Sequence, residues 1–160
     1  MLEAYGLLGD KFMLDSSVGM ADCIIREMDE LGVLPNDTGT FNGLPSCSLM
    51  KPMLILYRYT EDKKYLDFCL KIADRWERVE IMPAIIANSL SDKRIREWYP
   101  DSNKWAKAYE MMSCFEGLLE YYRVTGNDDC KTAVVNFVDA VAKTDITVAP
   151  ASTAQESSKA

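Results

Sequence analysis

The sequence predicts an all-α fold built from antiparallel helical hairpins, and three observations lead to this prediction. Apolar residues recur at steps of three and four along most of the chain, with almost no alternating strand pattern. Clusters of Gly, Pro, Asn and Asp divide these apolar stretches into pieces of helix length. The hairpins also repeat, because LYRYTEDKKYLDFCLKIADRW aligns with YYRVTGNDDCKTAVVNFVDAV at an offset of 65 residues (122 − 57).

The repeat predicts three copies of one structural unit. Tyr57 aligns with Tyr122 in the two clear copies. A fainter copy opens the chain, where EAYGLLGDKFM places Gly9 at the position of Gly126. Each copy is expected to form a buried leading helix, a short turn and an amphipathic trailing helix. The first copy lacks most of its leading helix, so we expect the chain to be a fragment of a larger array.

Capping residues and prolines set the expected boundaries of the helices. Ser16 or Ser17 is expected to cap the first long helix, and Gly32 to end it in a left-handed turn. Pro52 is expected in the first turn of the next helix, where its missing N–H is harmless. We expect helices at residues 17–31, 46–60, 62–79, 104–125 and 128–143, a loop at 33–45 and a less regular stretch at 80–103.

The length and composition predict one domain, and the net charge disfavours two classes of partner. We expect a helical-hairpin domain over residues 1–145 and an irregular or disordered tail over residues 146–160, where Ala, Ser and Thr predominate. The net charge of −7 disfavours nucleic acid and anionic membrane surfaces as partners. No secretion signal or membrane-spanning run is visible, so we expect a cytoplasmic protein.

The chain contains no histidine and five cysteines without a CxxC pair. The missing histidine removes the commonest general base and the commonest metal ligand. We therefore expect no zinc site within this chain and no disulfide framework. Cys69 and Cys130 fall on inward stripes and are expected in the core, whereas Cys47 and Cys114 fall near helix starts, where a thiolate is stabilised.

The most conspicuous acidic side chains lie in KAYEMMSCFEGLLEYYRVTGN. A helical wheel places Glu116 and Glu120 together at one edge of an apolar arc, which predicts solvated flank charges. Glu110 lies in the expected first turn, where the helix macrodipole favours carboxylates and incoming anions, or it is simply a helix-start charge. Gly117 is expected to allow close approach of another helix.

Aromatic side chains in the irregular stretch are a second set of candidates. Trp98, Tyr99 and Trp105 could stack on the CH-rich face of a sugar ring, or they could belong to the core. Composition and spacing leave both interpretations open.

Two phrases carry a family resemblance. GLPSCSLMKPMLILYRYTEDKKYLDF and KAYEMMSCFEGLLEYYRVTGN resemble the beta-L-arabinofuranosidase-like glycoside hydrolases, over roughly residues 2–156. The resemblance implies a catalytic (α/α)6 barrel of six hairpins, so that the three copies here would form about half of the toroid. It also implies carbohydrate as the partner and a zinc-containing site whose ligands, like the cysteine nucleophile, lie downstream of the matched region.

The resemblance also implies candidate site residues. TDITVAPASTAQES is similar to the family segment that leads to the acid/base glutamate, which places that role on Glu156. Ser48 and Lys107 stand where family members carry histidine, and Lys51 where they carry glutamate. These positions lie at the starts of buried helices, the ends that face substrate in such barrels. The candidate substrate-binding residues are Ser48, Lys51, Lys107, Glu110, Tyr99 and Trp105.

Two hypotheses about function follow. The first is a fragment of a glycoside hydrolase, inactive on its own because the nucleophile is missing. The second is a non-enzymatic α-hairpin repeat module that binds a protein or peptide in a groove. A narrow polar pocket with an aromatic platform would favour sugar, and an open apolar groove would favour a protein. A half-barrel would also expose apolar edges, so we expect self-association or marginal stability.

Overall fold

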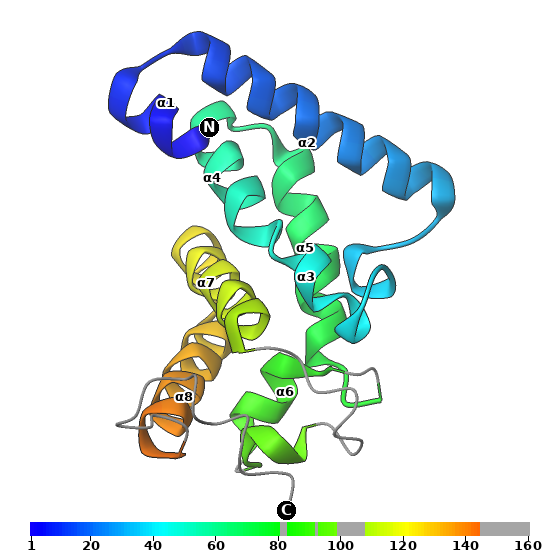
Figure 1. Ribbon diagram of the computed structural model, residues 1–160, viewed down its shortest axis with the longest axis vertical. Helices are drawn as coiled ribbons and strands as arrows, with labels where there is room; N and C mark the ends of the chain where they lie inside the picture. The colour runs from blue at the N-terminus through cyan, green and yellow to red at the C-terminus, as the bar shows by residue number, and fades with distance from the viewer. Residues whose placement is uncertain (81–82, 92, 99–107, 145–160) are drawn as a thin grey trace, which may run out of the picture.

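The computed structural model describes residues 1–80, 83–91, 93–98 and 108–144, and every regular element in these ranges is helical (Figure 1). The all-α prediction is therefore confirmed for this part of the chain. The tail at 146–160 lies outside the described residues. The elements are α1 (Leu2–Leu8), α2 (Lys11–Leu31), η1 (Pro35–Asp37), η2 (Phe41–Gly43), α3 (Leu44–Cys47), α4 (Met50–Thr60), α5 (Lys63–Glu77), α6 (Ile85–Leu90), η3 (Ile95–Glu97), α7 (Ala108–Thr125) and α8 (Asp128–Thr144), where η marks a short 3₁₀ turn.

Three hairpins, α1–α2, α4–α5 and α7–α8, share one turn geometry. In each, the residue after the leading helix has left-handed backbone angles, and its N–H donates to a tyrosine carbonyl four residues earlier. This is the left-handed C-cap that satisfies an orphan helix carbonyl. The three bonds run from Gly9 to Tyr5 (2.8 Å), from Glu61 to Tyr57 (2.7 Å) and from Gly126 to Tyr122 (2.7 Å).

The residue that follows each turn caps the trailing helix. Asp10, Asp62 and Asn127 each accept a hydrogen bond from the backbone N–H two residues later. Thr60 and Thr125 match as well, because each hydroxyl donates to the carbonyl four residues earlier at 2.8 Å. The alignment of the three copies therefore corresponds to one repeated local structure.

The leading helices α4 and α7 pack side by side, and their contacts advance together along both helices. The Cys114 thiol donates to the Leu44 carbonyl at the start of α3, which precedes α4, at 3.3 Å, while Arg58 near the end of α4 pairs with Glu120. The two helices therefore run in the same general direction. The trailing helix α5 packs on α4, and the trailing helix α8 packs on α7. Helix α6 packs against both trailing helices, α5 and α8.

Gly117 lies where α4 and α7 approach most closely. A Cβ atom at this position would come within 3.0 Å of the Met50 Cβ atom. The prediction that this glycine permits close helix approach is thus confirmed. A side chain here would force the two leading helices apart.

Helix α2 lies along one side of the molecule and is tied to α5 by polar contacts (Figure 1). The Tyr65 hydroxyl donates to Asp22 at 2.8 Å, and Lys64 pairs with the same carboxylate at 2.8 Å. Lys71 pairs with Asp29, about two helical turns further along both helices. These contacts join the first hairpin to the second.

The first long helix begins earlier than predicted. It starts at Lys11 and not at residue 17, because the Asp10 side chain accepts from the Phe12 N–H and caps the helix there. The Ser17 hydroxyl instead donates to the Met13 carbonyl inside the helix. The predicted end is correct, since Gly32 adopts left-handed angles after Leu31.

The helix predicted at 46–60 is divided into α3 and α4. Pro52 is the third residue of α4 and has no N–H to donate to an earlier carbonyl. The break between α3 and α4, at residues 48–49, lies about one helical turn before Pro52. The helix predicted at 62–79 spans Lys63–Glu77, and the irregular stretch contains α6, which the sequence pattern did not predict.

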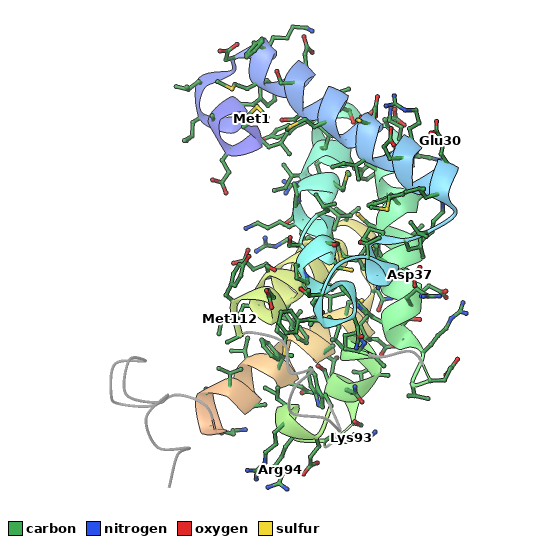
Figure 2. All side chains as sticks on the ribbon, turned by 45° about the vertical axis from the view of Figure 1, so that its right-hand side comes forward. Met1, Glu30, Asp37, Lys93, Arg94 and Met112 are labelled. Carbon is green, nitrogen blue, oxygen red and sulfur yellow. The ribbon has the colours of Figure 1, made fainter. Side chains whose placement is uncertain are left out.

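The core forms where the leading and trailing helices meet. Its largest fully buried side chains include Trp76, Tyr65 and Leu118, drawn from α5 and α7. Met112, which a helical wheel of residues 104–125 places in the apolar arc, is 45% exposed and lies on the outer side of α7 (Figure 2). The apolar arc of α7 is therefore narrower than the helical wheel indicates.

Candidate functional site

Three of the predicted site residues lie in the part of the chain that the structure describes: Ser48, Lys51 and Glu110. They belong to the starts of the leading helices, as the sequence indicates, because Ser48 and Lys51 flank the beginning of α4 and Glu110 is in the first turn of α7. The remaining predicted residues, Tyr99, Trp105, Lys107 and Glu156, lie outside the described residues.

Lys51 connects the two leading helices through an ion pair. Its Nζ atom lies 2.9 Å from Oε2 of Glu116 on α7. The hydrogen bond to Glu116 raises the pKa of Lys51 above its usual value. Both side chains remain accessible, at 39% and 61% exposure, so this pair offers a cation and a carboxylate to solvent on one surface.

Ser48 and Glu110 are less available to a ligand. The Ser48 hydroxyl donates to the Pro45 carbonyl at 2.6 Å, a carbonyl that also accepts from the Ser48 backbone N–H at 3.3 Å. Glu110 is only 6% exposed, and its backbone carbonyl accepts from the Ser113 hydroxyl at 2.8 Å. Of these three residues, Lys51 therefore presents its charged group most openly.

Glu120 is a polar centre that the sequence analysis did not predict. It is 4% exposed, whereas the helical wheel placed it among the solvated flank charges, and that prediction is wrong. Arg58 Nη1 lies 2.6 Å from one carboxylate oxygen and Arg123 Nη1 lies 3.0 Å from the other. The available signal was the repeat itself, which aligns these two arginines at an offset of 65 residues (123 − 58).

The environment of Glu120 favours its ionised form. Burial raises the pKa of this carboxyl, but hydrogen bonds from Arg123 and Arg58 outweigh burial and hold the pKa below its usual value. The charge is therefore paired and hydrogen-bonded, which is what a buried carboxylate requires. Its role is to fasten α7 to α4.

The buried cysteines are core residues without reactive character. Cys47, Cys69, Cys114 and Cys130 are each 0% exposed, which confirms the prediction for Cys69 and Cys130. Burial raises the pKa of the Cys114 thiol to about 12 and that of Cys47 still further. The expectation that helix starts stabilise a thiolate at these two positions is therefore wrong, because desolvation is the larger effect.

Trp98 belongs to the core and offers no sugar platform. It is 3% exposed, and its indole N–H donates to the Lys93 carbonyl at 3.1 Å. Its ring packs against Phe115 and Phe137, whose own rings stack at a centroid distance of 3.8 Å. Of the two interpretations left open for this residue, the core interpretation is correct.

An apolar groove of about 380 Å³ lies between α1, α2 and α4. We call it the N-terminal groove. Lys51 and Glu3 are the charged residues among those that line it. The side chains that form its apolar surface include Leu2 of α1, Met20, Ala21 and Ile24 of α2, and Met53 and Leu56 of α4.

A smaller hollow of about 260 Å³ lies at the opposite end, between α6 and α8. Lys93 and Arg94 lie beside each other at this end of the molecule (Figure 2). Arg94 is paired with Glu97, and Lys143 across the hollow is paired with Asp139. Much of the positive charge here is therefore already neutralised.

No group of three or more His, Cys, Asp or Glu side chains in the described part of the chain is placed to hold a metal ion. None of the described helices is both long enough and apolar enough to cross a membrane.

Comparison with known proteins adds no relative. No family model, curated protein or solved structure matches the chain. The resemblance to glycoside hydrolases rests on the sequence phrases alone.

Proposed function

We propose that the chain is a helical-hairpin part of a carbohydrate-active glycoside hydrolase acting on arabinofuranoside-like substrates. In this proposal its three hairpins form about half of an (α/α)6 toroid. The observation that carries it is the packing of the hairpins: α4 and α7 run side by side in the same general direction, with α5 packed on α4 and α8 packed on α7. Such a packing is what a toroid of hairpins requires. The sequence resemblance supplies the chemical class.

The proposed sugar-facing surface lies at the starts of the leading helices. The Lys51–Glu116 pair is exposed there and provides donors and acceptors for sugar hydroxyl groups. The positive end of the α7 macrodipole lies at the same end of the hairpins and favours the carboxylate of Glu110 in the first turn. Glu110 supports this surface from a buried position in the first turn.

The chemistry would require groups beyond those in the described residues. In glycoside hydrolysis one carboxylic acid protonates the leaving glycosidic oxygen while a nucleophile attacks the anomeric carbon. The resemblance assigns the acid/base role to Glu156 and places the nucleophile outside the matched region. We therefore expect the isolated chain to bind sugar weakly and to release no product from aryl arabinofuranosides.

Calorimetric titration with arabinofuranosides tests the binding surface. Lys51→Ala is expected to weaken binding about tenfold, since one charge-assisted hydrogen bond is worth roughly 1.5 kcal/mol. Lys11→Ala is the matched control, because Lys11 pairs with Asp15 on α2 and is 81% exposed. Equal affinities for the two variants, or clear turnover of an aryl arabinofuranoside by the isolated chain, would contradict the proposal.

One observation favours the alternative, a non-enzymatic module that binds a protein or peptide. The N-terminal groove is lined mostly by apolar side chains and is not a narrow pocket with convergent polar groups. Failure of all tested sugars to bind, together with binding of an apolar helical peptide, would favour this second function.

A further inference from the structure

Arg58 and Arg123 bring two guanidinium groups together on the surface between the second and third hairpins. Arg58 lies in the last turn of α4, and Arg123 lies in the last turn of α7. Both donate to one carboxyl group, because Arg58 Nη1 lies 2.6 Å from Oε1 of Glu120 and Arg123 Nη1 lies 3.0 Å from Oε2. Two positively charged side chains from two helices are therefore held beside each other by a shared anchor.

The charges in this cluster do not cancel. Glu120 is 4% exposed, and a buried carboxylate needs one positive partner for its charge to be neutralised. It has two partners, so two guanidinium groups and one carboxylate leave a net charge of +1 (2 − 1). The neighbouring Lys51–Glu116 pair, one helical turn before Glu120, is neutral by itself. One positive charge thus remains at the surface of a chain whose net charge is −7.

Most of the hydrogen-bonding capacity of the two arginines is unused. A guanidinium group has five N–H donors arranged in one plane. Arg58 and Arg123 each use the Nη1 atom on Glu120, and neither pairs with a second carboxylate among the described residues. Both side chains remain accessible, at 60% and 59% exposure. Their remaining donors can therefore reach an oxygen-rich group from solvent.

We infer that Arg58 and Arg123 form a binding site for the phosphate group of a small soluble ester. A phosphate group is anionic and has several acceptor oxygens, so it can accept parallel hydrogen bonds from two planar guanidinium groups. The net charge of −7 disfavours an anionic membrane surface as the source of the phosphate. The inference does not depend on sugar binding.

Glu120 is the positioning residue of this site. It holds both guanidinium groups from a buried position, so that fewer side-chain rotamers are lost when a ligand binds. It also comes from α7, whereas Arg58 comes from α4, so the site exists only where these two helices are packed together.

Titration of the full ¹⁵N-labelled chain with glycerol 3-phosphate at constant ionic strength tests the site. The arginine Nε–Hε resonances report on each side chain separately. Saturable shifts are expected for Arg58 and Arg123, with little change for Arg94. Arg94 is the matched control because it is also 59% exposed and pairs with a glutamate, Glu97. Shifts of equal size at all three arginines would indicate general attraction and would overturn the inference.

Arg123→Lys tests the planar geometry of the donors. The variant keeps the positive charge but replaces the fork with a single ammonium group, so the affinity should fall about fivefold or more. Arg94→Lys should leave the affinity unchanged. An affinity that Arg123→Lys does not alter would count against the site.

Glu120→Gln separates a positioned site from simple attraction between charges. The variant removes a negative charge, so attraction alone would strengthen phosphate binding. A site that depends on Glu120 should instead bind glycerol 3-phosphate more weakly, and a gain in affinity would contradict the positioning role. Vesicles containing phosphatidic acid should not bind the chain. Binding to these vesicles without binding to glycerol 3-phosphate would overturn the assignment to a soluble ester.

Discussion

At the scale of single residues, the pairing of the buried Glu120 with Arg58 ties the third hairpin to the second, and Arg123 on the same helix pairs with the other carboxylate oxygen. Glu120→Gln keeps the size of the side chain but removes the charge, so the two arginines lose their partner. We expect a loss of about 1 kcal/mol in the free energy of unfolding, since both arginines are well exposed and solvent screens part of the attraction. Glu27→Gln on the surface of α2 is the control.

The same variant has a defined pH dependence. Because the folded pKa of Glu120 is depressed, its stabilisation is fully present above its unfolded pKa, about 4.3, and is lost as the pH falls through the lower folded value. The stability difference between the parent chain and Glu120→Gln should therefore shrink below about pH 4. Urea unfolding at several pH values measures it, and a constant difference would contradict the pairing.

At the scale of elements, Gly117 and Gly19 form a matched pair of helix-interior glycines. A Cβ atom at Gly117 would lie 3.0 Å from the Met50 Cβ atom, whereas a Cβ atom at Gly19 would meet nothing within 4 Å. Gly19→Ala should stabilise the chain by about 0.5–1 kcal/mol through helix propensity. Gly117→Ala should instead destabilise it by about 1 kcal/mol or more, because the leading helices must separate.

Chemical denaturation of both glycine variants checks the packing of α4 on α7. A gain in stability from Gly117→Ala equal to that from Gly19→Ala would mean that the two helices are not in close contact.

The repeated turn predicts a stabilising substitution. Glu61 adopts left-handed backbone angles, with φ of 58°, at the position that Gly9 and Gly126 occupy in the other hairpins. A residue with a Cβ atom pays about 1 kcal/mol in this conformation. Glu61→Gly should therefore raise the melting temperature by a few degrees, and Gly126→Ala should lower it. A lower melting temperature for Glu61→Gly, or a higher one for Gly126→Ala, would show that the turns are not equivalent.

Much of the hairpin architecture could be predicted from the sequence because the repeat preserves local signals. The tyrosine, the left-handed residue and the Asx cap recur in order, and each acts through contacts within a few residues. Helix boundaries failed where tertiary packing or a competing cap decided them, as at Asp10 and at the break before α4.

The site was harder to predict because its state depends on distant neighbours. Burial of Glu120 follows from the packing of α4 on α7, which a helical wheel of α7 alone does not contain. The raised pKa of Cys114 depends on burial in the same way. Lys51 was correctly placed at a helix start, but its partner Glu116 lies 65 residues further along the chain.

At the scale of the whole molecule, the two ends of the hairpin array expose apolar side chains. Leu7, Leu8 and Phe12 are 70–86% exposed on the first hairpin, and Tyr109 and Val138 are 71% and 56% exposed on the third. We expect self-association that rises with concentration, because such edges are buried in a closed array. Leu8→Ser with Phe12→Ser should reduce it in sedimentation equilibrium, and a monodisperse monomer with a single cooperative melt would contradict this expectation.

The central claim is that the starts of the leading helices form a sugar-facing surface. Titration of the ¹⁵N-labelled chain with an arabinofuranoside, followed by amide chemical shifts, tests it most directly. The account predicts shifts that concentrate at Ser48–Lys51 and in the first turns of α7, with little change along α8. Shifts confined to α2, or no shifts at millimolar sugar, would contradict it.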